Sequence, residues 1–268
     1  RKGTFNKINM YNFDLIILTT ALNRSELHTV CLSPIPLLLK GLRVKWLINI
    51  DKVSEEDIKD TEHNLKKILL DDNIDLEVFH SLNPCIFKAA KMLSYEGYKY
   101  LNETKYGVFY LEDDWPIKVD PTKANLKQLL DKYLKSDKDY ITFRGRNRLN
   151  FNPGIFSKGL FEEKFIKRFA KNKYEPREPE ILVCEYWEDE EGNRIEEEQY
   201  TNINFPLKEV GGMLKPSIWF HGPEMGKEWV ENILGKTQWK KDGTTVNYHK
   251  NFSNGTHDSS SNLTYVSK

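Results

Sequence analysis

Short runs of large apolar residues recur along the first 143 positions of the chain, and each is followed by a polar stretch. Runs of this kind, rich in aromatic and β-branched side chains, are typical of strands that are buried on both faces of a parallel sheet. The pattern predicts strands over residues 13–20, 44–50, 75–79, 108–111 and 139–143.

Apolar residues with helical spacing separate these runs. They predict helices over residues 27–34, 58–69, 84–93, 126–133 and 160–169. Ser54 and Asp57 have the spacing of a capping box, and Asn83 followed by Pro84 has the pattern of an N-cap before a first helical proline. Alternation of strands and helices predicts an α/β fold with a mostly parallel sheet flanked by helices.

The alternation weakens after residue 143. Residues 144–154 have the composition of a long loop, and residues 175–205 are expected to form a β-hairpin insertion. Within that insertion, residues 181–187 are strand-like, residues 191–194 have turn chemistry, and the return arm is acidic. We expect one domain over residues 1–250, followed by a loose tail at 251–268 that is rich in Ser, Asn, Gly and Thr.

Composition limits the class of protein. The 268 residues are 39% hydrophobic and 30% charged, which is ordinary for a soluble globular protein. Lys plus Arg equals Asp plus Glu at 40 each, so net charge gives no reason to expect nucleic acid or an anionic membrane as a partner. Three scattered cysteines argue against a disulfide framework, and no apolar run approaches the ~20 residues of a membrane span. We expect a cytoplasmic protein without a membrane span or signal peptide.

Three adjacent acids, Glu112, Asp113 and Asp114, directly follow the predicted strand 108–111. Ligands of open α/β sheets bind at the carboxyl ends of the strands, so these acids are expected at the site of chemistry. A divalent cation would relieve the repulsion between them, which suggests Mg²⁺ or Mn²⁺ bound together with a phosphorylated ligand. The alternative is a solvated acidic turn.

Four segments together resemble the nucleotide-sugar glycosyltransferases of the GT-A fold, in the style of family 2. They are residues 19–27 with their Thr-Thr-Ala-Leu-Asn-Arg opening, Asp51 at the end of the second strand, the Leu-Glu-Asp-Asp-Trp sequence at 111–115, and residues 221–229. The Leu-Glu-Asp-Asp-Trp form is similar to that of some viral and bacterial members. The chain departs from the family's Asp-x-Asp motif in having Glu112 at its first position.

The resemblance implies a GT-A fold with a nucleotide-binding half at 13–115 and an acceptor half at 116–250. It implies metal binding by Asp114, Glu112 and His221, and the imidazole of His221 favours Mn²⁺ over Mg²⁺. The bound ion would stabilise the departing diphosphate of a nucleotide-sugar donor, for which UDP is the expected nucleotide. The implied donor-binding residues are Thr19, Thr20, Asn23, Arg24, Asp51, Glu112, Arg144 and Arg146.

The resemblance does not choose the acceptor or the stereochemistry. An inverting enzyme needs a carboxylate base, and Asp113, Glu178, Glu180 and Glu224 qualify by residue type. We take Asp113, Asp114 and Glu224 as the candidate catalytic residues. The acceptor would be a glycan, a lipid-linked sugar or a protein. A hydroxymethylated base in DNA is the alternative, since basic residues over 144–173 could line one face. The same residues could equally be a solvated helix face.

Two other classes stay open at this point. A nucleotidyltransferase also uses an α/β sheet, acids and Mg²⁺, but usually carries a Gly-rich loop after its first strand, where this chain has Thr-Thr-Ala-Leu-Asn-Arg. A non-catalytic carbohydrate-binding module could use Trp187, Trp219, Trp229 and Trp239 as stacking platforms. That class leaves the acidic triplet unexplained. The sequence does not predict the oligomeric state.

Overall fold

The computed structural model describes the core of the chain and leaves several segments undescribed. The described residues are 11–23, 25–51, 55–81, 85–117, 120–122, 124, 126–136, 138–143, 151–171, 179–183, 186–188, 194–196, 202–204, 240–241 and 244–245. None of the helices within these residues is long and apolar enough to cross a membrane.

Strands and helices alternate regularly through the first 110 residues. Their order is β1 (Phe13–Leu22), α1 (Ser25–Cys31), α2 (Ile35–Leu38), β2 (Val44–Asp51), α3 (Glu55–Ile68), β3 (Ile74–Ser81), α4 (Ile86–Tyr98), a 3₁₀ turn η1 (Leu101–Glu103) and β4 (Thr104–Tyr110). The predicted strands in this part of the chain are confirmed, each within a few residues of its expected ends.

The second half contains shorter elements. They are α5 (Leu126–Leu134), β5 (Tyr140–Thr142), β6 (Gly154–Phe156), α6 (Lys158–Phe161), a π-helical segment η2 (Glu162–Ile166), α7 (Lys167–Lys171), α8 (Glu180–Val183), β7 (Tyr186–Glu188), β8 (Arg194–Glu196), β9 (Asn202–Asn204), β10 (Lys240–Lys241) and β11 (Thr244–Thr245). The helix predicted over 160–169 is therefore present, with one π-helical turn in its middle.

A seven-stranded sheet organises the fold, in the order β3-β2-β1-β4-β6-β5-β9. The pairs β1–β2, β2–β3, β1–β4 and β5–β9 are parallel, and only β6 runs against its neighbours β4 and β5. Strand β1 therefore lies inside the sheet, with β2 and β3 on one side and β4, β6, β5 and β9 on the other. The prediction of a mostly parallel sheet flanked by helices is confirmed.

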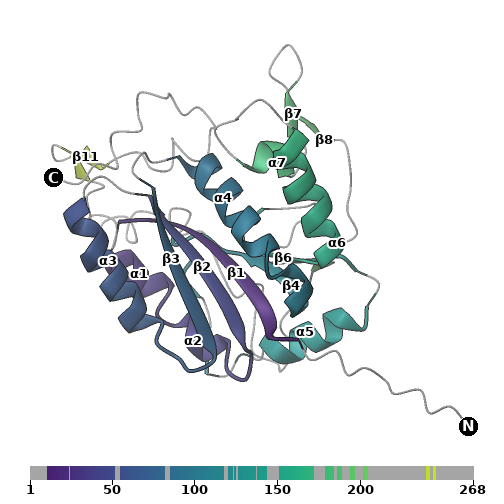
Figure 1. The fold of residues 1–268 in the computed structure, drawn as a ribbon, viewed down its shortest axis with the longest axis horizontal. Helices are drawn as coiled ribbons and strands as arrows, with labels where there is room; N and C mark the ends of the chain where they lie inside the picture. The colour runs from purple at the N-terminus through teal and green to yellow at the C-terminus, as the bar shows by residue number, and fades with distance from the viewer. Residues whose placement is uncertain are drawn as a thin grey trace, which may run out of the picture.

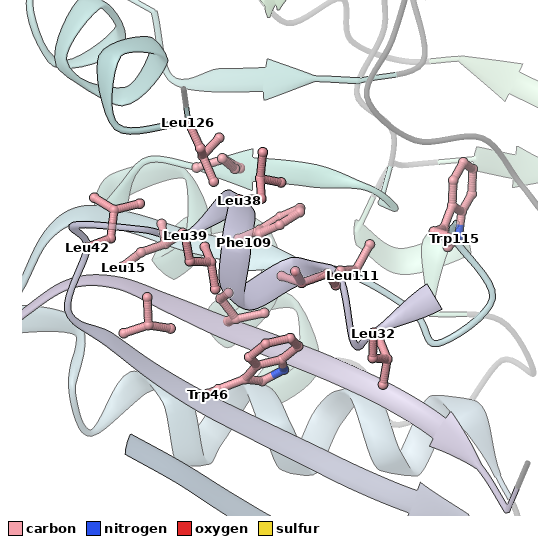
Figure 2. Packing of buried hydrophobic residues seen from close by; sticks show 14 of the residues in the cluster. Leu15, Leu32, Leu38, Leu39, Leu42, Trp46, Phe109, Leu111, Trp115 and Leu126 are labelled. Carbon is pink, nitrogen blue, oxygen red and sulfur yellow. The ribbon is translucent and has the colours of Figure 1, made fainter. Parts of the chain in front are cut away.

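Both faces of the sheet are buried, which explains why its strands are apolar without alternation. Leu15 and Ile17 of β1 join a first cluster that α2, α3 and α5 cover, and this cluster also holds Trp46 (Figure 2). Ile16 and Leu18 point the other way, into a second cluster under α4, α6 and α7. Figure 1 shows α4 and α1–α3 on opposite sides of β1, β2 and β3.

Gly107 lets β4 and β6 approach closely. Its φ is +130°, and a Cβ at this position would lie 2.1 Å from the backbone oxygen of Phe156. Any other residue would have to push β6 away from β4 and would also be strained at that φ. This glycine is therefore needed to hold the strand that leads into the acidic triplet against its antiparallel partner.

Three local predictions were wrong. Strand β6 begins at Gly154, the last residue of the loop expected over 144–154, and it was not predicted because it is only three residues long and gains its order by pairing between β4 and β5. Helix α4 has Cys85, not Asn83, at its N-cap. Residues Glu180–Val183 form helix α8, where we expected a strand, and Val183 packs into the second cluster.

The hairpin prediction is confirmed in its pairing. Strands β7 and β8 are antiparallel, with Tyr186 opposite Glu196 and Glu188 opposite Arg194. Its connecting residues 189–193, residues 144–150 of the expected loop and the tail 251–268 lie outside the described residues. The division into a nucleotide-binding half and an acceptor half stays a prediction.

Candidate active site

The carboxyl ends of β1, β2 and β4 meet at one edge of the sheet. Leu22 at the end of β1 is in register with Asp51 at the end of β2. Beyond β4 the chain keeps following β1, because the Leu111 N–H donates to the Leu18 carbonyl at 2.9 Å and the Asp113 N–H donates to the Thr20 carbonyl at 3.2 Å. The fold thus brings the acidic triplet beside Thr20, Leu22 and Asp51, which are far from it in sequence.

The three acids of the triplet have different surroundings. Glu112 is half-buried, and its N–H donates to Asn152 Oδ1 at 3.0 Å. Asp113 is only 2% exposed, and its Oδ2 accepts hydrogen bonds from the Leu22 N–H at 3.1 Å and from His28 Nε2 at 3.2 Å. Asp114 is 3% exposed. The middle acid is therefore engaged by residues of β1 and α1.

Trp115 completes the turn after the triplet. Its side chain is buried in the first cluster, and Figure 2 shows it on the loop after Leu111, apart from Trp46. Burial of an indole this large resists displacement of the turn, since a buried aromatic side chain contributes several kcal/mol, on the order of 3, to stability. The backbone bonds to β1 and this anchor hold the acidic turn at both of its ends.

Asp51 is a buried carboxylate that accepts a hydrogen bond at the start of helix α4. Its Oδ2 accepts from the Cys85 N–H at 2.9 Å and its Oδ1 accepts from Asn49 Nδ2 at 2.9 Å. Burial raises the pKa of Asp51 from its usual 3.8 to about 6, and the charge of Asp113 acts in the same direction, although these hydrogen bonds oppose the shift. Asp51 supplies the N-terminal acceptor that we had assigned to Asn83, and this is why α4 begins at Ile86.

We expect the buried charge of Asp51 to make the stability of the ligand-free protein depend on pH. A folded pKa of about 6 lies above the ordinary 3.8, so the folded state binds the proton more tightly than the unfolded chain. Ionisation of Asp51 therefore leaves the unfolding free energy unchanged below pH 3.8. As pH rises, it lowers this free energy increasingly, by up to about 3 kcal/mol above pH 6.

The measurement is urea unfolding of the wild type and of Asp51→Asn at pH values from 4 to 8. Relative to the wild type, the variant should gain up to about 3 kcal/mol in unfolding free energy across this range, because asparagine carries no charge. Asp60→Asn, at an exposed position of α3, is the control and should shift the curve by the same amount at every pH. Parallel curves for Asp51→Asn and the wild type would contradict the assignment.

Residues Thr19, Thr20 and Asn23 all contact neighbouring elements. The hydroxyl of Thr19 is buried in the core and accepts from Trp46 Nε1 at 3.0 Å, and the hydroxyl of Thr20 accepts from the Tyr110 hydroxyl at 3.2 Å. Asn23 Oδ1 accepts from the Thr61 hydroxyl of α3. Asn23 and Thr20 therefore lie near the edge with the acids, while the Thr19 side chain points into the first cluster.

Five predicted site residues lie outside the described part of the chain: Arg24, Arg144, Arg146, His221 and Glu224. Among the described residues, no group of three His, Cys, Asp or Glu side chains could hold a metal ion by itself. Glu112 and Asp114 nevertheless suit an ion shared with a ligand, because Mg²⁺-type ions are commonly bound by one or two carboxylates plus substrate phosphates. Of the described residues, Glu112 and Asp114 would hold such an ion, which would supply positive charge to a bound phosphate.

Three further residues, His28, Asn152 and Tyr110, contribute to this edge. His28 binds Asp113, and Asn152 binds the backbone of Glu112. Tyr110, fully buried, has its pKa raised by burial and also by the charges of Glu112, Glu180 and Asp51. Glu180, which had qualified only by residue type, acts electrostatically on Tyr110, the last residue of β4. The one sequence signal for His28 was a polar residue among Leu27, Cys31 and Leu32, all buried.

No protein-family model matches the sequence, and no characterised protein is similar to it at the sequence level. Several solved glycosyltransferases are similar in structure. PcManGT, a mannosyltransferase from Pyrobaculum calidifontis in complex with GDP-Man and Mn²⁺, aligns over 58% of this chain and 47% of its own, with 10% identity and a TM-score of 0.42. TarS from S. aureus aligns over 94% of this chain and 47% of its own, with 11% identity and a TM-score of 0.47.

The galactosyltransferase LgtC aligns over 93% of this chain and 99% of its own, with 11% identity and a TM-score of 0.38. In the alignments with PcManGT and TarS, this chain spans about half of their length. At these identities and TM-scores the likeness concerns the general arrangement of strands and helices. The function of this chain has to be inferred from its own side chains.

Proposed function

We propose that this protein is a metal-dependent glycosyltransferase that binds a nucleotide-sugar donor at the edge formed by β1, β2 and β4. The observation that carries this proposal is the arrangement of the acidic turn: Asp113 faces inward, and Glu112 and Asp114 flank it at the carboxyl end of β4. Two adjacent acids at a strand end suit a divalent ion that also contacts the diphosphate of the donor.

The residues of the site have separable roles in this proposal. Asp114 and Glu112 hold the ion, with His221 as a further ligand from outside the described residues. The bound ion supplies charge stabilisation to the departing diphosphate. Asp51 accepts hydrogen bonds from the nucleoside of the donor, and Asn23 lines the same side. Arg24, Arg144 and Arg146 are the proposed phosphate contacts.

Asn152 is a proposed contact for the donor or its sugar. Its Oδ1 is taken by the Glu112 N–H, and the residue is 4% exposed. Among the described residues, its Nδ2 group is buried and has no hydrogen-bond partner. Because a buried donor without a partner is costly, an oxygen of a bound sugar or phosphate would satisfy it.

Glu180 is the best-supported general base among the four carboxylates that qualify by residue type. Asp113 is engaged by Leu22 and His28, and Glu178 and Glu224 lie outside the described residues. Glu180 opens α8, which is fixed in place by Val183 in the second cluster, and its charge raises the pKa of Tyr110 in that cluster. Deprotonation of an acceptor hydroxyl by Glu180 would make the enzyme inverting.

The described part of the basic run does not favour DNA as the acceptor. Lys164 is 4% exposed, Lys167 forms an ion pair with Glu163 at 2.7 Å, and Lys158 lies over the ring of Tyr11. Side chains engaged in this way are poorly placed to contact phosphates. A glycan, lipid-linked sugar or protein hydroxyl is the proposed acceptor class.

A thermal-shift screen tests the proposed function. The probes are UDP-glucose, UDP-GlcNAc and GDP-mannose, each with Mn²⁺, Mg²⁺ or EDTA; GDP-Man and UDP-GlcNAc are included because PcManGT and TarS were solved with them. A ligand at a hundredfold excess over its dissociation constant should add about 2.7 kcal/mol to the unfolding free energy. Stabilisation by one donor, lost in EDTA, supports the proposal. The absence of any shift with all donors and both metals would overturn it.

A further inference from the structure

The middle acid of the triplet is part of a buried contact between the acidic turn and the first helix. A single oxygen, Oδ2 of Asp113, accepts from the Leu22 N–H at 3.1 Å and from His28 Nε2 at 3.2 Å. The side chains of His28 and Asp113 are 0% and 3% exposed. Because a carboxylate only accepts hydrogen bonds, His28 carries its proton on Nε2, and its Nδ1 is buried without a hydrogen-bond partner among the described residues.

This contact joins the two segments that the donor would need at the same time. His28 lies on α1, which begins two residues after Asn23, and Leu22 is the last residue of β1. Asp113 lies between the two acids that the proposed function assigns to the metal. A shift of α1 would therefore be transmitted through His28 and Asp113 to Glu112 and Asp114, and a shift of the turn would be transmitted back to the loop at Asn23.

The backbone of the turn is fixed on both sides of this contact. The Asp113 N–H donates to the Thr20 carbonyl on one side, and the Glu112 N–H donates to Asn152 Oδ1 on the other. With the backbone held and the middle side chain turned inward, little freedom is left for the flanking carboxylates. Side chains that bind metal or phosphate perform best when neighbouring residues restrict them in this way.

We infer that His28 and Asp113 are positioning residues, which set the acidic turn for a divalent ion and diphosphate without contacting either. This inference rests on the proposed function. It removes Asp113 from the candidate catalytic bases and assigns a role to His28, for which the sequence gave no motif. The expected consequence of losing the contact is weaker metal binding, because changes to groups that support metal ligands typically lower metal affinity by about 10- to 100-fold.

Two variants of His28 and one control separate positioning from general packing. His28→Leu removes the N–H donor at similar volume, and His28→Gln keeps an N–H donor of similar reach. His63→Leu, at an exposed position of α3, is the matched control. The first measurement is hydrogen exchange of the ligand-free proteins. In His28→Leu, the amides of Leu22 and Asp113 should exchange at least about tenfold faster than in the wild type, while His63→Leu should not change them.

The second measurement is the Mn²⁺ concentration that gives half of the thermal stabilisation by UDP, or by GDP if only GDP stabilises the wild type. We expect at least a tenfold increase for His28→Leu, recovery of most of that loss in His28→Gln, and no change in His63→Leu. If His28→Leu does not fold, His28→Phe takes its place, since phenylalanine keeps a buried aromatic ring but has no N–H donor for Asp113.

The outcomes are distinguishable from those of the proposed function. Unchanged exchange at Leu22 and Asp113 in a folded His28→Leu or His28→Phe would overturn the positioning role, and so would an unchanged Mn²⁺ requirement. A wild type that shows no Mn²⁺-dependent stabilisation by UDP or GDP would instead count against the proposed function. In that case, exchange still decides whether His28 holds the acidic turn.

Discussion

Replacing Asp114 by asparagine should reduce metal-dependent sugar transfer by at least about a thousandfold while leaving the protein folded. The carboxylate is proposed to hold the ion that stabilises the departing diphosphate, and losing a preorganised electrostatic contact of this kind typically costs about 10²- to 10³-fold in rate before any loss of metal affinity is added. Asparagine keeps the volume of the buried side chain, which is 3% exposed, so the fold should persist.

The measurement is release of the nucleoside diphosphate with the donor identified by the thermal-shift screen, at Mn²⁺ concentrations from well below to well above saturation. Asp72→Asn, an exposed acid in the loop before β3, is the matched control and should keep wild-type turnover. Raising Mn²⁺ should restore part of the lost rate if the defect lies in metal binding. A folded Asp114→Asn enzyme with more than one tenth of the wild-type rate would contradict the assignment.

The second large effect is expected at Glu180. A general base typically contributes about 10²- to 10⁴-fold, so Glu180→Gln should lower kcat by about that factor with little change in donor affinity or in the Mn²⁺ requirement. This combination differs from that of Asp114→Asn, where metal dependence changes as well. The distinction follows from placement: Glu180 lies on α8, and the metal-binding acids lie on the turn after β4.

Glu163→Gln is the control for Glu180, because Glu163 is an exposed acid of the neighbouring η2 segment whose ion pair with Lys167 is also exposed. Exposed pairs contribute little, so this variant should retain its activity. Product stereochemistry gives a second readout, since direct displacement of the diphosphate by an acceptor hydroxyl that a base activates inverts the anomeric configuration. Retention of configuration, or a loss of less than tenfold in Glu180→Gln, would remove Glu180 from this role.

The sequence was most informative where burial on both faces dictated the residues. Strands β1, β2 and β4 each contain an apolar run that packs against helices on both faces of the sheet, and these runs predicted where the strands lie. Strand β6 could not be recognised, because three residues carry no periodicity and its order depends on β4 and β5. The start of α4 was misplaced because its capping acceptor, Asp51, is distant in sequence.

The candidate site was predictable in location but not in its internal roles. An acidic triplet after a buried strand predicts a cluster at the sheet edge, and the structure places it there beside Asp51. The three acids look equivalent in the sequence. Contacts from Leu22 and His28, more than 80 residues earlier, give Asp113 a separate role. His28 lies in the helix predicted over 27–34, but helical spacing did not mark this polar residue as buried, so this partner was overlooked.

The most direct test of the account is the position of Mn²⁺ in a crystal grown with the nucleoside diphosphate of the active donor. Anomalous scattering at the manganese edge locates the ion independently of the protein model. The account predicts a peak that contacts the Asp114 carboxylate and an oxygen of the diphosphate, with Asp113 still bonded to His28 and Leu22. A bound nucleotide without manganese at the acidic turn, or manganese bound elsewhere, would contradict it.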